Sequence, residues 1–352
     1  MGHYISKSSE LFINTMSIEK LTSDWMNIWN QINLPVGKQA GYAKMIGNVS
    51  KLTEFSSNAL PNYQLKIPLP FYFNRYNAGL SIPLISLLHS DVRLTLDLEK
   101  LENLIISDPL TKFSKSGRPK LKLYLKYIYL ENEERKMFAE SKHEYLIEQQ
   151  NYRSYSHYGT HFETKINLKQ PVKDIFWFAQ PKQNAATKQY FNYTNSKYYK
   201  LLSNYDRYDE DNPVTELSRQ FYQTLYAKYP NIQYIPMYIN NQIKELPETS
   251  KSPINNSQLR LNGQKRFDLD SGMTTLVNFH KYDNIPVNGL HGYSFARHPN
   301  EYQPSGSCNF SQLGDAFFSL DTDDGSYNVQ VIARNYNLLR IMGGQAGLAF
   351  EL

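Results

Sequence analysis

The stretch from Tyr293 to Gly344 restricts the fold more than any other part of the chain. It contains two β-prone runs of alternating apolar and polar residues, and Asp324-Gly325 lies between Phe318 and Val329. An Asp-Gly pair between two such runs is a strong short-range signal for a β-hairpin. The stretch therefore predicts a hairpin near the end of the chain.

The second strand of this hairpin has a clear period of two. Val329, Val331 and Ala333 would share one face, and the opposite face would carry Gln330 and Arg334. Side chains of a strand alternate between its two faces. The pattern predicts a half-buried strand, with the apolar row towards the core.

Further strands are expected along the whole chain, separated by Pro, Gly and Asn. They cover residues 63–69, 92–98, 121–129, 162–168 and 171–180. Leu259 to Gln264 adds an Asn-Gly turn at Asn262-Gly263. Many short strands between such turns, with few helices, favour an antiparallel sandwich or jelly roll.

Helices are expected only as short pieces between strands. Leu21 to Asn33 reads as a surface helix with an N-cap at Thr22-Ser23-Asp24, pinned by its tryptophans and stopped by Leu34-Pro35. A loop through Gly37, Gly41 and Gly47 should follow. Residues 182–256, rich in Tyr, Asn, Lys and Asp, predict a long loop with one helix over 214–228.

Composition and charge narrow the class of protein. The 352 residues are 41% apolar and 20% charged, which is typical of a globular chain with one large or two ordinary domains. The net charge of +5 is mildly basic. The most basic segment, residues 112–126, is interpreted as a solvated loop leading into a strand, so no specific nucleic-acid partner is expected. The single cysteine, Cys308, excludes an intrachain disulfide and indicates a reducing compartment.

Membrane signals are weak. The longest nearly apolar run, Leu80 to Leu88, contains Pro83 and is shorter than the roughly 20 residues of a membrane helix. No secretory signal is expected. Gly2 fits a loose myristoylation pattern, but no polybasic segment follows it as a second anchor.

Several motifs follow one another in a fixed order. In the last third these are residues 293–296 (YSFA), 298–301 (HPNE), 303–311 (QPSGSCNFS) and 335–344 (NYNLLRIMGG). In the first half they include Asp24-Trp25, Gly41-Tyr42, residues 67–71 (IPLPF) and residues 143–149 (HEYLIEQ). Together they resemble the major capsid proteins of large double-stranded DNA viruses of eukaryotes. A match over dozens of residues in order is far more specific than a short motif.

This resemblance implies an all-β double jelly roll with short helices in its loops. It divides the chain near Glu140, into a first jelly roll over 1–140 and a second over 141–352 that contains the 182–256 insertion. A jelly roll has eight strands, and we count only about five in residues 1–140. The first jelly roll therefore looks truncated at its N-terminus, with an open sheet edge. Another polypeptide would complete the sheet, or the chain is a split or fragmentary gene product, or the fold differs locally.

The function implied by the resemblance is structural. Family members form homotrimers with a pseudo-hexagonal outline that build an icosahedral shell, in contact with neighbouring capsomers and minor capsid proteins. The implied location is the virion, with synthesis and assembly in the host cell cytoplasm. Two alternatives stay open: a jelly-roll carbohydrate-binding module or glycosidase, and a scaffold-type relative of the capsid fold.

No catalytic, cofactor-binding or metal-binding residue is predicted. Four patterns only partly match a functional site: a His157/His161 zinc pair, a calcium loop at Asp321, Asp323 and Asp324, a glycine fingerprint at Gly343-Gly344 and Gly347, and an acid pair at Glu133-Glu134. Each fits a turn, loop or connector better. Sequons stand at Asn48, Asn192, Asn255 and Asn309, and in the resembled family some members carry surface glycans.

Overall fold

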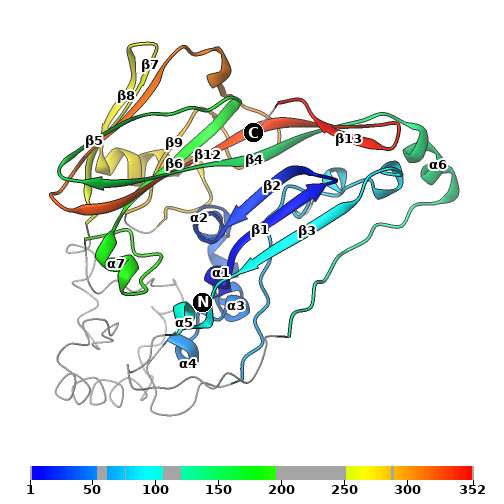
Figure 1. Ribbon diagram of the computed structural model, residues 1–352, viewed down its shortest axis with the longest axis horizontal. Helices are drawn as coiled ribbons and strands as arrows, with labels where there is room; N and C mark the ends of the chain where they lie inside the picture. Colours follow the sequence, from blue (N-terminus) through cyan, green and yellow to red (C-terminus); the bar gives the residue numbers. More distant parts are fainter. Residues whose placement is uncertain are drawn as a thin grey trace.

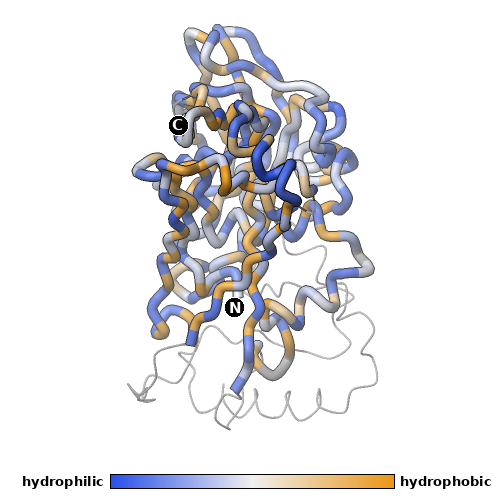
Figure 2. Tube along the Cα trace, turned by 90° about the vertical axis from the view of Figure 1, so that its right-hand side faces the viewer, coloured by the Kyte–Doolittle hydropathy of each residue, from blue (hydrophilic) through white to orange (hydrophobic). Residues whose placement is uncertain are grey.

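The computed structural model describes residues 2–53, 62–75, 77–105, 120–195, 251–286 and 289–350. Within these ranges the strands form three antiparallel sheets with short helices between them (Figure 1). Apolar and polar residues recur at short intervals along the chain trace, as strands with one or two buried faces require (Figure 2).

The N-terminal region contains a three-stranded sheet of order β2-β1-β3. Its strands are β1 (Ser6–Ile13), β2 (Met16–Thr22) and β3 (Val92–Leu98). The short helices around it are α1 (Gly2–Ile5), α2 (Ser23–Asn33), α3 (Val36–Ile46), α4 (Ser50–Thr53), η1 (Ala78–Leu80), η2 (Leu84–Ser86) and α5 (Leu101–Leu104). The helix α6 (Asn132–Glu140) connects this region to the rest of the chain.

The C-terminal region contains the other two sheets. The six-stranded sheet consists of β4 (His143–Tyr158), β6 (Pro171–Pro181), β9 (His291–Ser294), β10 (Cys308–Asn309), β12 (Ser326–Met342) and β13 (Gln345–Leu348). The four-stranded sheet has the order β5 (His161–Lys165), β11 (Ala316–Thr322), β7 (Ile254–Leu261), β8 (Gln264–Asp270). Four short helices complete the region: α7 (Lys182–Ala186), η5 (Met273–Val277), η6 (Asn278–Lys281) and η7 (Phe310–Gln312).

Two hydrophobic clusters lie on the two sides of the six-stranded sheet. Val329, Val331 and Ala333 of β12 belong to the cluster shared with the four-stranded sheet. Ile332 and Leu339 of the same strand belong to a second cluster, shared with the N-terminal region. The prediction that the apolar row at 329, 331 and 333 faces a core is confirmed. The prediction of a half-buried strand is wrong, because the N-terminal region covers the other face.

The Asp324-Gly325 hairpin prediction is also wrong. The strands it joins lie in different sheets, because β11 pairs with β5 and β7 whereas β12 pairs with β4, β6 and β13. The dipeptide signals a reversal of the chain, but it does not determine which strands become neighbours. The Asn262-Gly263 turn, by contrast, forms a true hairpin between β7 and β8, with positive φ at both residues (50° and 80°).

Three of the five predicted strand segments are observed. Residues 92–98 form β3, residues 171–180 lie within β6, and 162–168 are strand only as far as Lys165. Residues 63–69 and 121–129 form no strand, so those two predictions are wrong. Alternating apolar residues favour an extended backbone, but a strand also needs a neighbour to bond with.

The predicted helix at 21–33 is observed as α2. The Thr22 hydroxyl accepts a hydrogen bond from the Trp25 backbone N–H at 3.2 Å, which confirms the cap. The surface placement is wrong, because Trp25 is fully buried against Phe176 of the six-stranded sheet. The predicted glycine loop is wrong as well: residues 36–46 form α3, and Gly47 ends it in the left-handed conformation at φ 74°.

The connector and the insertion have mixed outcomes. The many charges of residues 131–140 predict a short exposed connector. These residues are exposed apart from half-buried Phe138, but residues 132–140 form the helix α6. Of the insertion at 182–256, the structure describes residues 182–195, which include α7, and residues 251–256. The predicted helix over 214–228 and the basic residues 112–119 lie outside the described residues.

Candidate assembly surface

The strand β3 is the outermost strand of the N-terminal sheet and has one unpaired edge. Its apolar residues face the same side as Leu11 and Ile13 of β1, which are buried. However, Val92 and Leu96 are 37% and 39% exposed to solvent. Among the described residues no strand continues the sheet beyond them, and both side chains are exposed. Within the described part of the chain, this edge is an unfilled position for a further strand.

Residues 120–130 are a second unpartnered feature. They are extended, and the described residues supply no strand partner or backbone hydrogen bond to them. Every residue from 121 to 129 is exposed, including Leu121, Leu123 and Leu125 at 54–60% and Tyr129 at 93%. In Figure 1 this segment leads into α6 along the outer side of the molecule, apart from β3. A contiguous apolar row in water is typical of an interaction surface.

Between the two regions lies a buried ion cluster on the six-stranded sheet. Arg334 of β12 donates through Nε to Asp174 Oδ1 of β6 at 3.0 Å and through Nη2 to the other carboxylate oxygen. Its Nη1 lies 3.5 Å from Glu148 Oε2 of β4. Because β12 pairs with both β4 and β6, one arginine reaches two carboxylates on opposite sides. All three side chains are at most 3% exposed.

Two more cations attach other segments to this cluster. Lys173 donates to Glu148 Oε1 at 2.5 Å and to the Glu301 carbonyl at 3.1 Å. Arg75 donates to Glu148, and its guanidinium lies 4.3 Å from the Trp29 ring centre of α2. The cluster therefore joins the six-stranded sheet to the N-terminal region and to the loop at Glu301.

The charges set the ionisation of these groups. Burial opposes ionisation of Glu148, but Arg334, Arg75 and Lys173 outweigh it and hold the pKa of Glu148 well below its ordinary value. Burial likewise opposes the charged form of Arg334, but Asp174 and Glu148 raise its pKa above the ordinary value. Glu148 and Arg334 are thus ionised together. This arrangement holds β4, β6 and β12 to one another by buried charges.

Two further buried carboxyl groups have raised pKa values. Burial raises the pKa of Glu19 to about 7, although nearby Arg75 and hydrogen bonds from the Tyr72 N–H and the Gln150 amide act in the other direction. Burial raises the pKa of Asp24 to about 6. Both residues belong to the N-terminal region where it meets the six-stranded sheet.

The histidine and aspartate patterns form no metal site. His161 Nδ1 pairs with Asp321 Oδ1 at 2.7 Å, whereas the His157 ring contacts the Gly159 carbonyl. Asp323 accepts hydrogen bonds from Asn195 and Asn255. Within the described ranges, no three His, Cys, Asp or Glu side chains gather as metal ligands would.

The remaining patterns have structural roles. Gly343-Gly344, both at positive φ, form the turn between β12 and β13. The Glu134 carboxylate accepts from the Glu131 N–H at the start of α6. Cys308 is half-buried beside the sandwich core, and burial raises its pKa. None of the helices that the structure describes is both long and apolar enough to cross a bilayer.

The four sequon asparagines differ in solvent exposure. Asn255 and Asn309 are exposed, Asn48 is half-buried, and Asn192 is 2% exposed with its amide bonded to the Gln189 side chain at 2.8 Å. A glycan would have no room at Asn192 in the folded chain.

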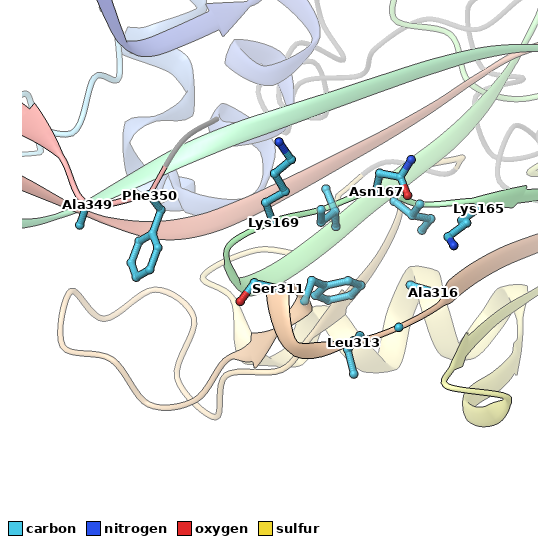
Figure 3. A pocket seen from close by; sticks show the side chains of 12 residues that line it. Lys165, Asn167, Lys169, Ser311, Leu313, Ala316, Ala349 and Phe350 are labelled. Atoms are coloured by element: carbon cyan, nitrogen blue, oxygen red, sulfur yellow. The ribbon is translucent and has the colours of Figure 1, made fainter.

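An open groove of about 630 Å³ lies beside the β5–β6 turn. Figure 3 shows Lys165, Lys169, Leu313 and Phe350 among the residues that line it. Lys165 is already paired with Asp315. The described lining contains two lysines and one serine, and no His, Cys, Asp or Glu side chain.

The comparison with protein families assigns both regions. Residues 134–347 match the model described as large eukaryotic DNA virus major capsid protein, and residues 1–131 match that of the major capsid protein N-terminus. The chain is 29% identical to the major capsid protein of Phaeocystis pouchetii virus, covering 99% of this chain and 81% of that protein. It is 30% identical to the major capsid protein of Pyramimonas orientalis virus, covering 99% and 77%.

Solved structures agree on the fold. A chain of the PBCV-1 virus capsid superposes with a TM-score of 0.74 at 23% identity, covering all of this chain and 84% of that one. The Faustovirus major capsid protein gives 0.64 at 14% identity, covering 97% and 72%. The predicted all-β, double jelly-roll class is confirmed. The chain belongs to the family of major capsid proteins of large eukaryotic DNA viruses.

Proposed function

We propose that this protein is a structural subunit of an icosahedral virus shell, and that three copies form one pseudo-hexagonal capsomer. The observation that carries the proposal is the match of capsid family models to both regions of the chain. Residues 1–140 and 141–352 would each supply one jelly-roll unit, so three chains would present six similar units around the ring.

The geometry of the chain supports a role in assembly rather than in catalysis. Its interior contains an ion cluster in which buried charges pair with one another, whereas its unpartnered apolar groups lie on the outside, along β3 and residues 120–130. Burial of such surfaces between subunits provides the main favourable free energy of association. Contacts with neighbouring capsomers and minor capsid proteins, and assembly in the host cytoplasm, belong to the same proposal.

Light scattering of the purified full chain tests this function. The expected mass is three times the 41.0 kDa of one chain, with hexagonal outlines in negative-stain images of the same peak. A well-folded monomer at every concentration tested would contradict the proposal for this chain alone.

A further inference from the structure

Residues 187–195, which follow α7, contact both regions of the molecule. They form neither helix nor strand, yet every one of them except Asn195 is at least half-buried. A buried segment without regular structure is held in place by its side chains and by donors from its neighbours. This segment is called the strap below.

One side of the strap is fixed to the C-terminal region. The Gln180 amide of β6 donates a hydrogen bond to the Tyr190 carbonyl at 2.7 Å. The Tyr193 ring is fully buried and stacks on Phe178 of β6, with 3.9 Å between the ring centres. A Cβ atom at Gly289 would lie 2.4 Å from the Tyr193 carbonyl oxygen, so a glycine is needed where the two backbones approach this closely.

Lys188 joins the strap to the N-terminal region at α5. Its ammonium donates to the backbone carbonyls of Glu102 and Ile105, the second at 2.7 Å. A cation at the end of a helix satisfies carbonyls that have no partner within the helix. Lys188 has a φ of 63°, a left-handed conformation that is costly for any residue except glycine. The contacts of the ammonium offset this cost.

Two tyrosines of the strap reach the other helices of the N-terminal region. The Tyr190 ring stacks on Tyr4 of α1 with 3.6 Å between the ring centres, and its hydroxyl donates to the Asn103 carbonyl at 3.1 Å. The Tyr193 hydroxyl donates to Asp24 Oδ1 of α2 at 3.0 Å. One short segment therefore holds α1, α2 and α5, which lie far apart in the sequence.

These contacts lie at one end of the junction between the two regions. Asp24 also accepts a hydrogen bond from the Gln330 amide at 3.3 Å, and Gln330 precedes Arg334 on β12. The ion cluster around Arg334 joins the regions further along the same strand. The strap has no ladder of backbone hydrogen bonds, and segments of this kind open at a lower free energy than sheets.

We propose that the strap is a latch that opens and closes one end of the junction as a unit, while the ion cluster around Arg334 holds the other end. The inference concerns a single chain and does not rest on the proposed assembly. The Asn195 N–H donates to the Lys251 carbonyl at 3.0 Å, so the latch also lies at the base of the 182–256 insertion. Contacts made through the insertion can thus reach the junction through the latch.

Hydrogen–deuterium exchange of the full chain, measured by mass spectrometry, tests the latch with two variants. Lys188→Gly removes the ammonium from α5 and at the same time relieves the left-handed backbone. Tyr193→Phe keeps the ring on Phe178 and removes the hydrogen bond to Asp24 of α2. Each variant should raise exchange by roughly tenfold at its own site, because each loses a hydrogen bond to or from a charged group.

The decisive result is the effect of each variant at the site of the other. Lys188→Gly should also raise exchange in residues 23–26 of α2, and Tyr193→Phe should also raise it in residues 101–105. Residues 334–342 of β12 and β11 should keep their protection in both variants. The matched control is Lys182→Met, an exposed lysine of α7, which should change none of these rates.

Three outcomes overturn the latch. Increases confined to the site of each substitution would show separate contacts rather than one unit. An equal increase in residues 334–342 or in β11 would show a loss of global stability. Unchanged or slower exchange in Lys188→Gly would show that the backbone conformation, and not the ammonium, determines how the strap behaves. Light scattering of the unsubstituted chain keeps the two proposals apart, since a monomer that shows the expected exchange contradicts the proposed function alone.

Discussion

The two regions of the molecule close their cores differently. In the C-terminal region, two sheets enclose one cluster of apolar side chains, and Leu259, Phe318 and Val329 within it have no exposed surface. In the N-terminal region, a three-stranded sheet lies against the face of the C-terminal six-stranded sheet, and no described strand pairs with its outer edge. The C-terminal region encloses a core of its own, whereas the N-terminal region shares its core with the six-stranded sheet.

The N-terminal region therefore depends on the six-stranded sheet of the C-terminal region for its stability. Its largest fully buried side chain, Trp25, packs on Phe176 of the six-stranded sheet rather than on a second sheet of the N-terminal region. The ion cluster around Arg334 joins the two regions at the same place. Changes at the junction and in the enclosed core should therefore cost far more than changes at the open edge.

Loss of the junction arginine should have the largest effect. Arg334→Met leaves Asp174 and Glu148 buried without their main cation, and removal of one partner of a buried pair costs about 3–5 kcal/mol. The measurement is the free energy of unfolding in urea. Arg340→Met on the same strand is the matched control, because Arg340 and Glu144 are both about half exposed and such pairs contribute about 0–1 kcal/mol. Equal costs would show that the cluster does not join the regions.

A pair of leucines tests the enclosed core against the open edge. Leu259→Ala removes a fully buried side chain from the sandwich and should cost about 2–5 kcal/mol. Leu96→Ala, at 39% exposed, should change the unfolding free energy of the isolated chain by about 1 kcal/mol or less. Both values come from the same denaturation experiment. A large cost at Leu96 would mean that the edge is already covered within one chain.

The pH dependence of the unfolding free energy, compared with and without the Glu19 carboxyl, tests how deeply the junction is buried. Its pKa of about 7 in the folded protein lies above the ordinary value of 4.5. The folded state therefore binds more protons than the unfolded state between these values, and this contribution to stability is lost as pH rises from 4.5 to 7. Glu19→Gln keeps an acceptor for the Tyr72 N–H, so at pH 8 the variant should be more stable by up to about 3 kcal/mol.

The same Glu19→Gln comparison at pH 4 is the control, since the native carboxyl is then neutral and the two proteins should differ little. A variant that is less stable at pH 8 would contradict the expectation and show that the charged form is needed by Arg75.

The smallest expected effect is at the cap of α2. Thr22→Ala removes the acceptor for the Trp25 N–H and should cost about 1 kcal/mol. Thr22→Ser keeps the hydroxyl and should lose much less. If both substitutions are neutral in thermal unfolding, the packing of Trp25 alone positions the helix.

The sequence predicts local features well. The cap at Thr22, the turn at Asn262-Gly263 and the strand at 92–98 depend on neighbouring residues and are confirmed. The order of the family motifs predicts the fold class, which is confirmed too.

Long-range features were missed for a physical reason. Asp324-Gly325 fixes a reversal, but three of the partner strands, β5 for β11 and β4 and β6 for β12, lie more than a hundred residues earlier in the chain. The ion cluster combines Arg75, Glu148, Asp174 and Arg334 from distant segments, which no local pattern reveals. One signal was available, since Lys173-Asp174 interrupts the otherwise apolar run of β6.

The position of β12 in the chain has a consequence for biosynthesis. This strand, Ser326–Met342, bridges β4, β6 and β13 and supplies residues to both hydrophobic clusters. It leaves the ribosome after nearly everything it holds together. Until then the earlier strands have no central partner, and apolar surface and strand edges stay exposed for many seconds at ordinary elongation rates of roughly 5–20 residues per second. We therefore expect the nascent chain to need chaperone protection until translation passes residue 342, and to fold late and all at once.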